Sequence, residues 1–120
     1  MIYTYKPKNE FYTNEKCFIT ELLNSDADAD CSVARARIEP GITTELHALL
    51  GTTERYVILE GEGVVEIDGC PATRVTTYDV VWIPEGACQR ITNSGTGDLV
   101  FLAICTPRFR PGNYLNMEKE

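Results

Sequence analysis

The chain has 120 residues, of which 43% are hydrophobic and 24% charged, and its formal net charge at pH 7 is −7. This length suits one domain, and no apolar run approaches the roughly 20 residues that a membrane span needs, so we expect no membrane contact. The N-terminus shows no secretory signal pattern, which predicts a cytoplasmic protein, and the acidic balance argues against nucleic acid, whose phosphates are bound by basic side chains.

The first part of the chain is predicted to form an arm and a strand. Residues 1–13 are rich in aromatic side chains without periodicity, which is typical of an N-terminal arm or a short edge strand. Residues 15–23 have the apolar content of a strand. The acidic segment 24–30 contains Asn, Ser and Asp, which favour turns, and we expect a solvated loop there.

The middle of the chain is predicted to be a series of short strands. Residues 32–39 alternate between apolar and charged side chains, which indicates a half-buried strand. Two strands are expected over 43–49 and 55–59, and Asp68-Gly69 is a strong hairpin signal. Further strands are predicted over 64–68, 72–77, 80–83, 90–93 and 99–105. Short strands between glycine-rich turns, without a sustained helical period, predict an all-β barrel or sandwich.

The tail after residue 106 contains two prolines, which exclude it from a central strand. We expect it to lie extended across the mouth or the outer wall of the barrel, with Phe109 and Tyr114 as packing anchors. Trp82 is expected to pack in the core. The whole chain, 1–120, is predicted to be one domain with a core over about 14–106, an arm over 1–13 and a tail over 107–120.

Two stretches carry family-type motifs. In the first, Gly41, His47, Glu54 and Gly61 follow the spacing of a motif that has glycines at both ends and histidine and glutamate between them. That motif has a second histidine where this chain has Leu49. His47 is the only histidine of the chain.

The second stretch lies about 30 residues further on. Pro84, Gly86 and Asn93 match the second motif, whereas Tyr78 replaces its glycine and Gln89 its histidine. With these two stretches the chain resembles the cupin superfamily of small β-barrels.

The resemblance covers roughly residues 30–106. It implies an all-β double-stranded β-helix, a jelly-roll-like barrel that binds a small-molecule ligand. Cupin-like proteins often dimerise through an N-terminal arm, so the aromatic arm predicts a homodimer.

The resemblance also implies a site for a divalent metal such as Mn, Fe, Ni or Zn. His47 and Glu54 would be two of its ligands, and the amide oxygen of Gln89 would be a weaker third. Glu45, two residues before His47 and expected on the same face, is a possible substitute. Because two of the four usual ligands are absent, a metal-free pocket is favoured over a metal-bound one.

A metal-free pocket would still have acid–base chemistry. A Glu54 carboxylate within hydrogen-bond reach of the imidazole would fix its tautomer and make His47 a candidate general acid or base. Tyr56 shares the inward parity of Glu54 and could donate a proton, although a barrel-lining aromatic is an equal alternative. The candidate catalytic residues are therefore His47, Glu54 and Tyr56.

The predicted ligand pocket consists of Glu45, His47, Leu49, Glu54, Tyr56 and Gln89. Its chemistry is compatible with an isomerase, lyase or oxygenase, either metal-assisted or acid–base. The alternatives are a cupin that binds or senses a small molecule without catalysis, and a structural or partner-binding protein.

Overall fold

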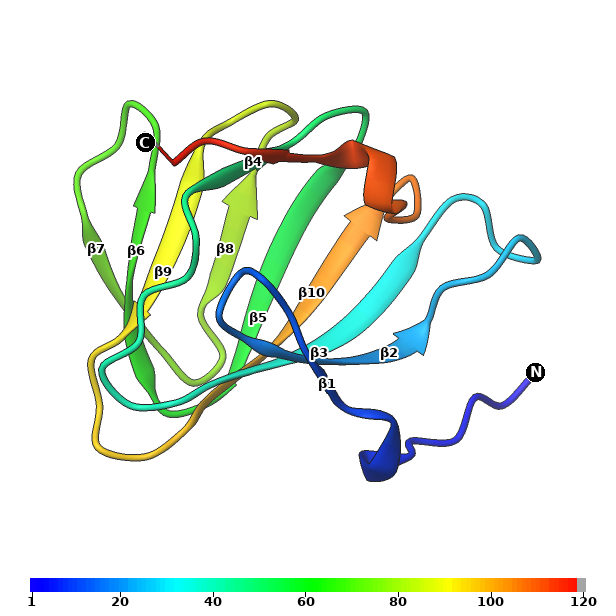
Figure 1. Ribbon diagram of the computed structural model, residues 1–120, viewed down its shortest axis with the longest axis horizontal. Helices are drawn as coiled ribbons and strands as arrows, with labels where there is room; N and C mark the ends of the chain where they lie inside the picture. The colour runs from blue at the N-terminus through cyan, green and yellow to red at the C-terminus, as the bar shows by residue number, and fades with distance from the viewer. Residues whose placement is uncertain (119–120) are drawn as a thin grey trace.

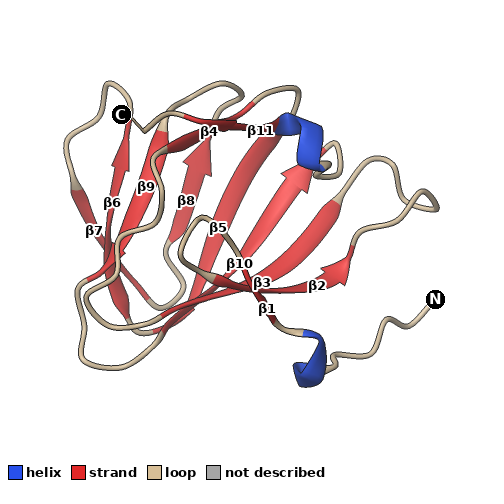
Figure 2. Ribbon diagram, in the orientation of Figure 1, coloured by secondary structure: helices blue, strands red, loops and turns tan. Residues whose placement is uncertain are grey.

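The structure is a computed structural model that describes residues 1–118, so the last two residues of the predicted tail lie outside the described part. Strands dominate it (Figure 1 and Figure 2). In chain order they are β1 (Phe11–Tyr12), β2 (Phe18–Leu23), β3 (Ser32–Ile38), β4 (His47–Leu49), β5 (Thr53–Glu60), β6 (Glu62–Ile67), β7 (Thr73–Thr76), β8 (Val80–Ile83), β9 (Gln89–Asn93), β10 (Leu99–Thr106) and β11 (Tyr114–Asn116). Two short 3₁₀ helices, η1 (Pro7–Asn9) and η2 (Pro111–Asn113), precede β1 and β11. No helix among residues 1–118 is long and apolar enough to cross a membrane.

The strands form two antiparallel sheets. One sheet has the order β1-β2-β3-β10-β5-β8, and the other has the order β11-β4-β9-β6-β7. From β3 to β10 the chain passes repeatedly from one sheet to the other, so neighbours in the sequence often face each other across the interior. This is the double-stranded β-helix that the sequence predicts, and the all-β fold class is confirmed.

The hydrophobic core lies between the two sheets and follows from the period-2 alternation of their strands. On β3, β5 and β10, Ile38, Ile58 and Leu99 are completely buried, as is Ile91 on β9 at 1% exposure. Leu99 is paired with Ile38, and Phe101 lies opposite Ile58, so these side chains occupy one end of the strands. The core is therefore concentrated at that end of the barrel.

Two elements differ from the sequence prediction. The strand expected over 43–49 is regular only from His47 to Leu49, and Thr43 makes an isolated bridge to Thr92. The tail adds a strand that was not predicted, because β11 pairs with β4 at the edge of its sheet. An edge position agrees with the exclusion of the proline-containing tail from a central strand.

The prediction that Trp82 packs in the core is wrong. On β8 the side chains of Val81 and Ile83 point inward, and alternation turns those of Val80 and Trp82 outward. Both outward side chains are 62% exposed. β8 is also the last strand of its sheet.

Candidate functional site

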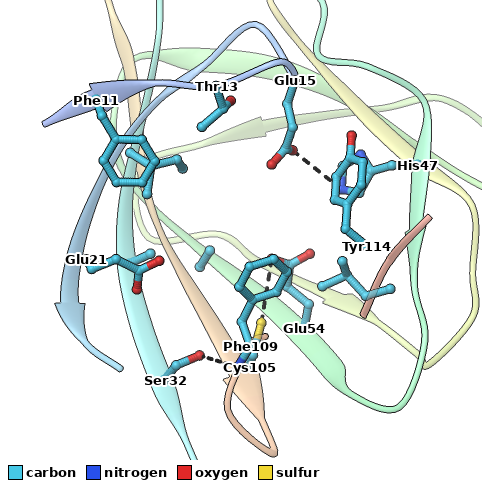
Figure 3. A pocket seen from close by; sticks show the side chains of 14 residues that line it. Phe11, Thr13, Glu15, Glu21, Ser32, His47, Glu54, Cys105, Phe109 and Tyr114 are labelled. Carbon is cyan, nitrogen blue, oxygen red and sulfur yellow. Dashed lines mark hydrogen bonds and ion pairs between the residues drawn. The ribbon is translucent and has the colours of Figure 1, made fainter. Parts of the chain in front are cut away.

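A cavity of about 180 Å³ opens between the sheets at the other end of the strands from the core. Side chains from both sheets, the N-terminal segment and the C-terminal tail surround it (Figure 3). The lining residues are Phe11, Thr13, Glu15, Ile19, Glu21, Ser32, Ala34, His47, Leu49, Glu54, Ala103, Cys105, Phe109 and Tyr114. The wall thus combines three carboxylates and one imidazole with mostly apolar side chains.

His47 lies on β4 and is only 2% exposed. Its Nδ1 is 2.7 Å from the backbone carbonyl oxygen of Glu45. A carbonyl can only accept a hydrogen bond, so Nδ1 carries the proton and donates it, which leaves Nε2 without one in the neutral ring. Nε2 lies 3.6 Å from a carboxylate oxygen of Glu15. The Tyr114 ring stacks on the imidazole at a centroid distance of 4.9 Å and fixes its plane (Figure 3).

Glu54 lies on β5 and belongs to a buried chain of hydrogen bonds. Gln89 Nε2 donates to Glu54 Oε1 at 2.8 Å, and the Tyr56 hydroxyl donates to Gln89 Oε1 at 2.5 Å. Burial raises the pKa of Glu54 to about 7, although the Gln89 hydrogen bond and the charge of His47 oppose this shift. The carboxyl group of Glu54, which lines the cavity, therefore changes between its protonated and charged forms near neutral pH.

Glu15 and Glu21 are site residues that the sequence analysis missed. Glu15 lies in the turn before β2, where its carbonyl oxygen accepts a hydrogen bond from the Glu45 backbone N–H at 3.0 Å. Burial raises the pKa of Glu15; His47 opposes the shift and the negative charge of Glu45 adds to it. Partial desolvation also raises the pKa of Glu21, on β2, although this residue is still exposed to solvent. The one sequence signal for these two site residues was that an acidic side chain occurs within the apolar segment 15–23.

The tail closes the cavity with two aromatic side chains. The Tyr114 hydroxyl donates to the Glu45 carboxylate at 2.6 Å. The Phe109 backbone N–H donates to Ser32 Oγ at 2.9 Å, and the Phe109 ring lines the cavity (Figure 3). These contacts join the tail to β3 and to the segment before β4, so the pocket is complete only when the tail is in place.

The structure brings together part of the predicted pocket. His47, Leu49 and Glu54 line one cavity. Tyr56 and Gln89 do not line it but are buried and hydrogen-bonded in the chain that ends on Glu54. The Glu45 carboxylate lies outside the lining and accepts the Tyr114 hydroxyl, because Glu45 precedes the strand and does not follow its alternation. The catalytic roles assigned to His47, Glu54 and Tyr56 stay predictions.

The donor set does not fit the predicted divalent metal site. Gln89 does not line the cavity: its oxygen accepts the Tyr56 hydroxyl and its nitrogen faces Glu54, so no amide oxygen is directed at a metal there. Across residues 1–118, no group of three or more His, Cys, Asp or Glu side chains is arranged to hold a metal ion. We therefore derive no step that passes through a metal.

The chain belongs to the cupin family, because the family model described as Cupin domain matches residues 34–105, more than half of the chain. An oxalate-binding protein of Thermotoga maritima is 38% identical over 71 residues, which cover 59% of this chain and 58% of that protein. The chain thus spans less than two thirds of that relative's length.

Solved structures have the same fold. The crystal structure of a predicted oxalate decarboxylase from Thermotoga maritima is 32% identical, with a TM-score of 0.69 over 76% of this chain and 80% of that chain. An uncharacterized protein with a double-stranded β-helix domain from Klebsiella pneumoniae has a TM-score of 0.76 over 93% of each chain. Its identity is 17%, so that likeness concerns the fold alone.

Proposed function

We propose that this cupin binds a small organic molecule in the cavity between its sheets, in contact with His47, Glu15 and Glu54. The observation that carries the proposal is the convergence of these polar groups on one cavity whose remaining wall is mostly apolar. Few polar groups in an apolar cavity are typical of small-molecule sites, where the polar groups orient the ligand and the apolar wall supplies affinity. The relative named for oxalate binding supports a small-molecule ligand in general.

A fragment screen on labelled protein would test this function. We expect binders to shift the backbone amide NMR signals of residues around the cavity. Ala34 lines the cavity on β3, whereas its neighbour Val33 faces the outside of the sheet. Ala34→Phe should fill the cavity and abolish these shifts, and Val33→Phe should leave them unchanged. Shifts that persist in folded Ala34→Phe, or an absence of binders to the parent protein, would remove the proposal.

A second candidate function is acid–base catalysis on the bound ligand. It is favoured by the pKa of Glu54, about 7, in the same cavity as the unprotonated Nε2 of His47. Nε2 would accept a proton from a ligand carbon, and protonated Glu54 would return one at a neighbouring position, which is an isomerisation without net proton change. Tyr56 would act only through Gln89, as a positioning residue.

Deuterium exchange separates binding from catalysis. A ligand that is bound and isomerised in D₂O should acquire deuterium from solvent at the neighbouring position, which receives its proton from Glu54. His47→Gln should abolish this exchange and Tyr56→Phe should only slow it. Bound ligands that acquire no deuterium over days would leave the non-catalytic binding protein as the function.

We also propose a homodimer that covers the apolar outer face at Val80 and Trp82. Both side chains are 62% exposed on an edge strand, and the N-terminal residues Met1 and Ile2 are exposed as well. Trp82→Lys should convert the dimer to a monomer in light-scattering measurements, and a monomeric parent protein would contradict the proposal.

A further inference from the structure

The charges around the cavity indicate which class of molecule it would take. Its wall contains three carboxylates, from Glu15, Glu21 and Glu54, and a single imidazole, but no lysine or arginine. Figure 3 shows Glu15 and Glu54 directed into the cavity from opposite sides. A dianion such as oxalate would lie among these carboxylates with no lysine or arginine to neutralise it, and like charges within one cavity repel each other. The charge pattern suits a ligand of the opposite sign.

The arginine side chains nearby are engaged elsewhere. Arg35 and Arg37 form ion pairs with Glu10 on the outer face, and Arg108 pairs with Asp26. Within residues 1–118, Glu15 forms no ion pair with a lysine or arginine and its carboxylate lies 3.6 Å from His47 Nε2, while Glu21 and Glu54 have no ion pair at all. The carboxylates of the cavity thus lack a lysine or arginine partner. Their raised pKa values agree with this, because burial dominates each of the three shifts.

The apolar wall adds a second feature that favours a cation. Phe11, Phe109 and Tyr114 supply aromatic rings from three separate segments, β1, the tail loop and β11. Aromatic faces attract ammonium groups through their quadrupole, and rings beside carboxylates are a recurrent way to bind an organic cation. An alkyl body would meanwhile pack on Leu49, Ile19 and the two alanines of the wall.

We propose that the cavity binds a small organic cation, an ammonium group with an apolar body, between the carboxylates of Glu15, Glu21 and Glu54 and the rings of Phe109 and Tyr114. This rests on the proposed small-molecule function and names the ligand class. The volume of about 180 Å³ lies below the range of roughly 300–1,000 Å³ for drug-sized sites, so the ligand has few heavy atoms. A ligand of this class differs from the oxalate in the relative's name, because the proposal requires a positive charge.

A pair of probes with one shape and different charge tests the ligand class. Choline and 3,3-dimethylbutan-1-ol have the same shape, but choline has a quaternary nitrogen and a positive charge where the alcohol has a neutral quaternary carbon. Oxalate is the negatively charged probe. We expect choline to shift the amide signals around the cavity and to bind at least about tenfold more tightly than the neutral alcohol, with no binding of oxalate. This comparison uses the unaltered protein, so it does not depend on whether a variant folds.

Matched variants locate the effect. Glu15→Gln and Glu54→Gln should each weaken choline binding about three- to tenfold and leave binding of the neutral alcohol within about twofold. Glu39→Gln makes the same change of net charge at an exposed position outside the cavity and should have no effect. Equal loss in Glu39→Gln would indicate a general charge effect and would overturn the proposal.

The outcomes distinguish this inference from the function on which it rests. If the neutral alcohol binds in the cavity as tightly as choline, or oxalate binds in preference to choline, the proposed cationic ligand is wrong. The proposal of small-molecule binding then still stands. If no probe and no fragment shifts the cavity signals, both proposals fall together.

Discussion

The two ends of the barrel interior are built from the same strands but differ in what they contain. On β5, Ile58 belongs to the packed core, and four residues earlier Glu54 lines the cavity. On β10, Phe101 is in the core and Cys105 in the cavity. The hydrogen-bonded register places Phe101 beside Ile58 and Cys105 beside Glu54, so the boundary between the two ends runs straight across the sheet.

The size of the inward side chains makes this difference. At the packed end the strands carry isoleucine, leucine and phenylalanine, which fill the space between the sheets. At the cavity end β3 and β10 carry Ser32, Ala34, Ala103 and Cys105, which are too small to reach the opposite sheet. One end therefore supplies stability through buried apolar area. The other end holds carboxylates whose raised pKa values show that their charge is unfavourable there.

The largest effect is expected from a cavity made at the packed end. Ile58 is completely buried, so Ile58→Ala should lower the free energy of unfolding by about 2–5 kcal/mol, because it removes buried methyl groups and leaves an empty space. Urea unfolding followed by circular dichroism would measure this. Leu59→Ala, at the neighbouring residue that is 38% exposed, is the control and should cost about 1 kcal/mol or less. Equal losses in both variants would show that Ile58 does not contribute a packed core at this end of the barrel.

The packed end was largely predictable from the sequence, because it depends on local patterns. Alternation gave the inward faces of β3 and β5, and Asp68-Gly69 gave the turn between β6 and β7, where Gly69 has a positive φ of 79°. Tyr78 stands at a glycine position of the second motif and has a φ of 71°, so the turn keeps its left-handed backbone without the glycine. The exposure of Trp82 was missed, since alternation alone does not say which face of an edge strand is covered.

The cavity end was predictable only in part. His47, Leu49 and Glu54 could be found because they lie on consecutive strands of the sequence with family-type spacing. Glu15 and Tyr114 come from segments about 100 residues apart, which meet only because the tail pairs with β4. No local pattern contains that contact. The orientation of Gln89 was equally hidden, because it depends on the hydroxyl of Tyr56 across the interior.

The next effect concerns the charge at the cavity end and depends on pH. The pKa of Glu54 rises from 4.5 to about 7 on folding, so between these values the folded chain holds a proton that the unfolded chain has lost. This group therefore stabilises the protein below pH 4.5, and its contribution is lost as the pH rises to about 7. Besides burial, the groups that influence the pKa of Glu54 are His47, Glu15, Gln89 and the Cys105 thiol.

Glu54→Gln removes this titration and keeps an oxygen that can accept the Gln89 hydrogen bond. We expect the variant to exceed the parent protein in unfolding free energy by about 1–3 kcal/mol at pH 8, with a difference near zero at pH 4.5. Urea unfolding at a series of pH values would measure this, and Glu39→Gln should show no such dependence. A difference that does not change between pH 4.5 and 8 would contradict the raised pKa.

The smallest effect is expected at the boundary between the two ends. Tyr56 packs on Phe101 of the core, at a centroid distance of 4.3 Å, and its hydroxyl donates to Gln89 in the chain that leads to the cavity. Tyr56→Phe keeps the packing but leaves the fully buried oxygen of Gln89 without its donor, which should cost about 1–2 kcal/mol of unfolding free energy. Tyr12→Phe, at a ring that is 60% exposed, is the matched control and should change stability by less than about 0.5 kcal/mol. If the two variants were equally stable, Gln89 would have to find another donor, and its amide would be free to turn its oxygen toward the cavity.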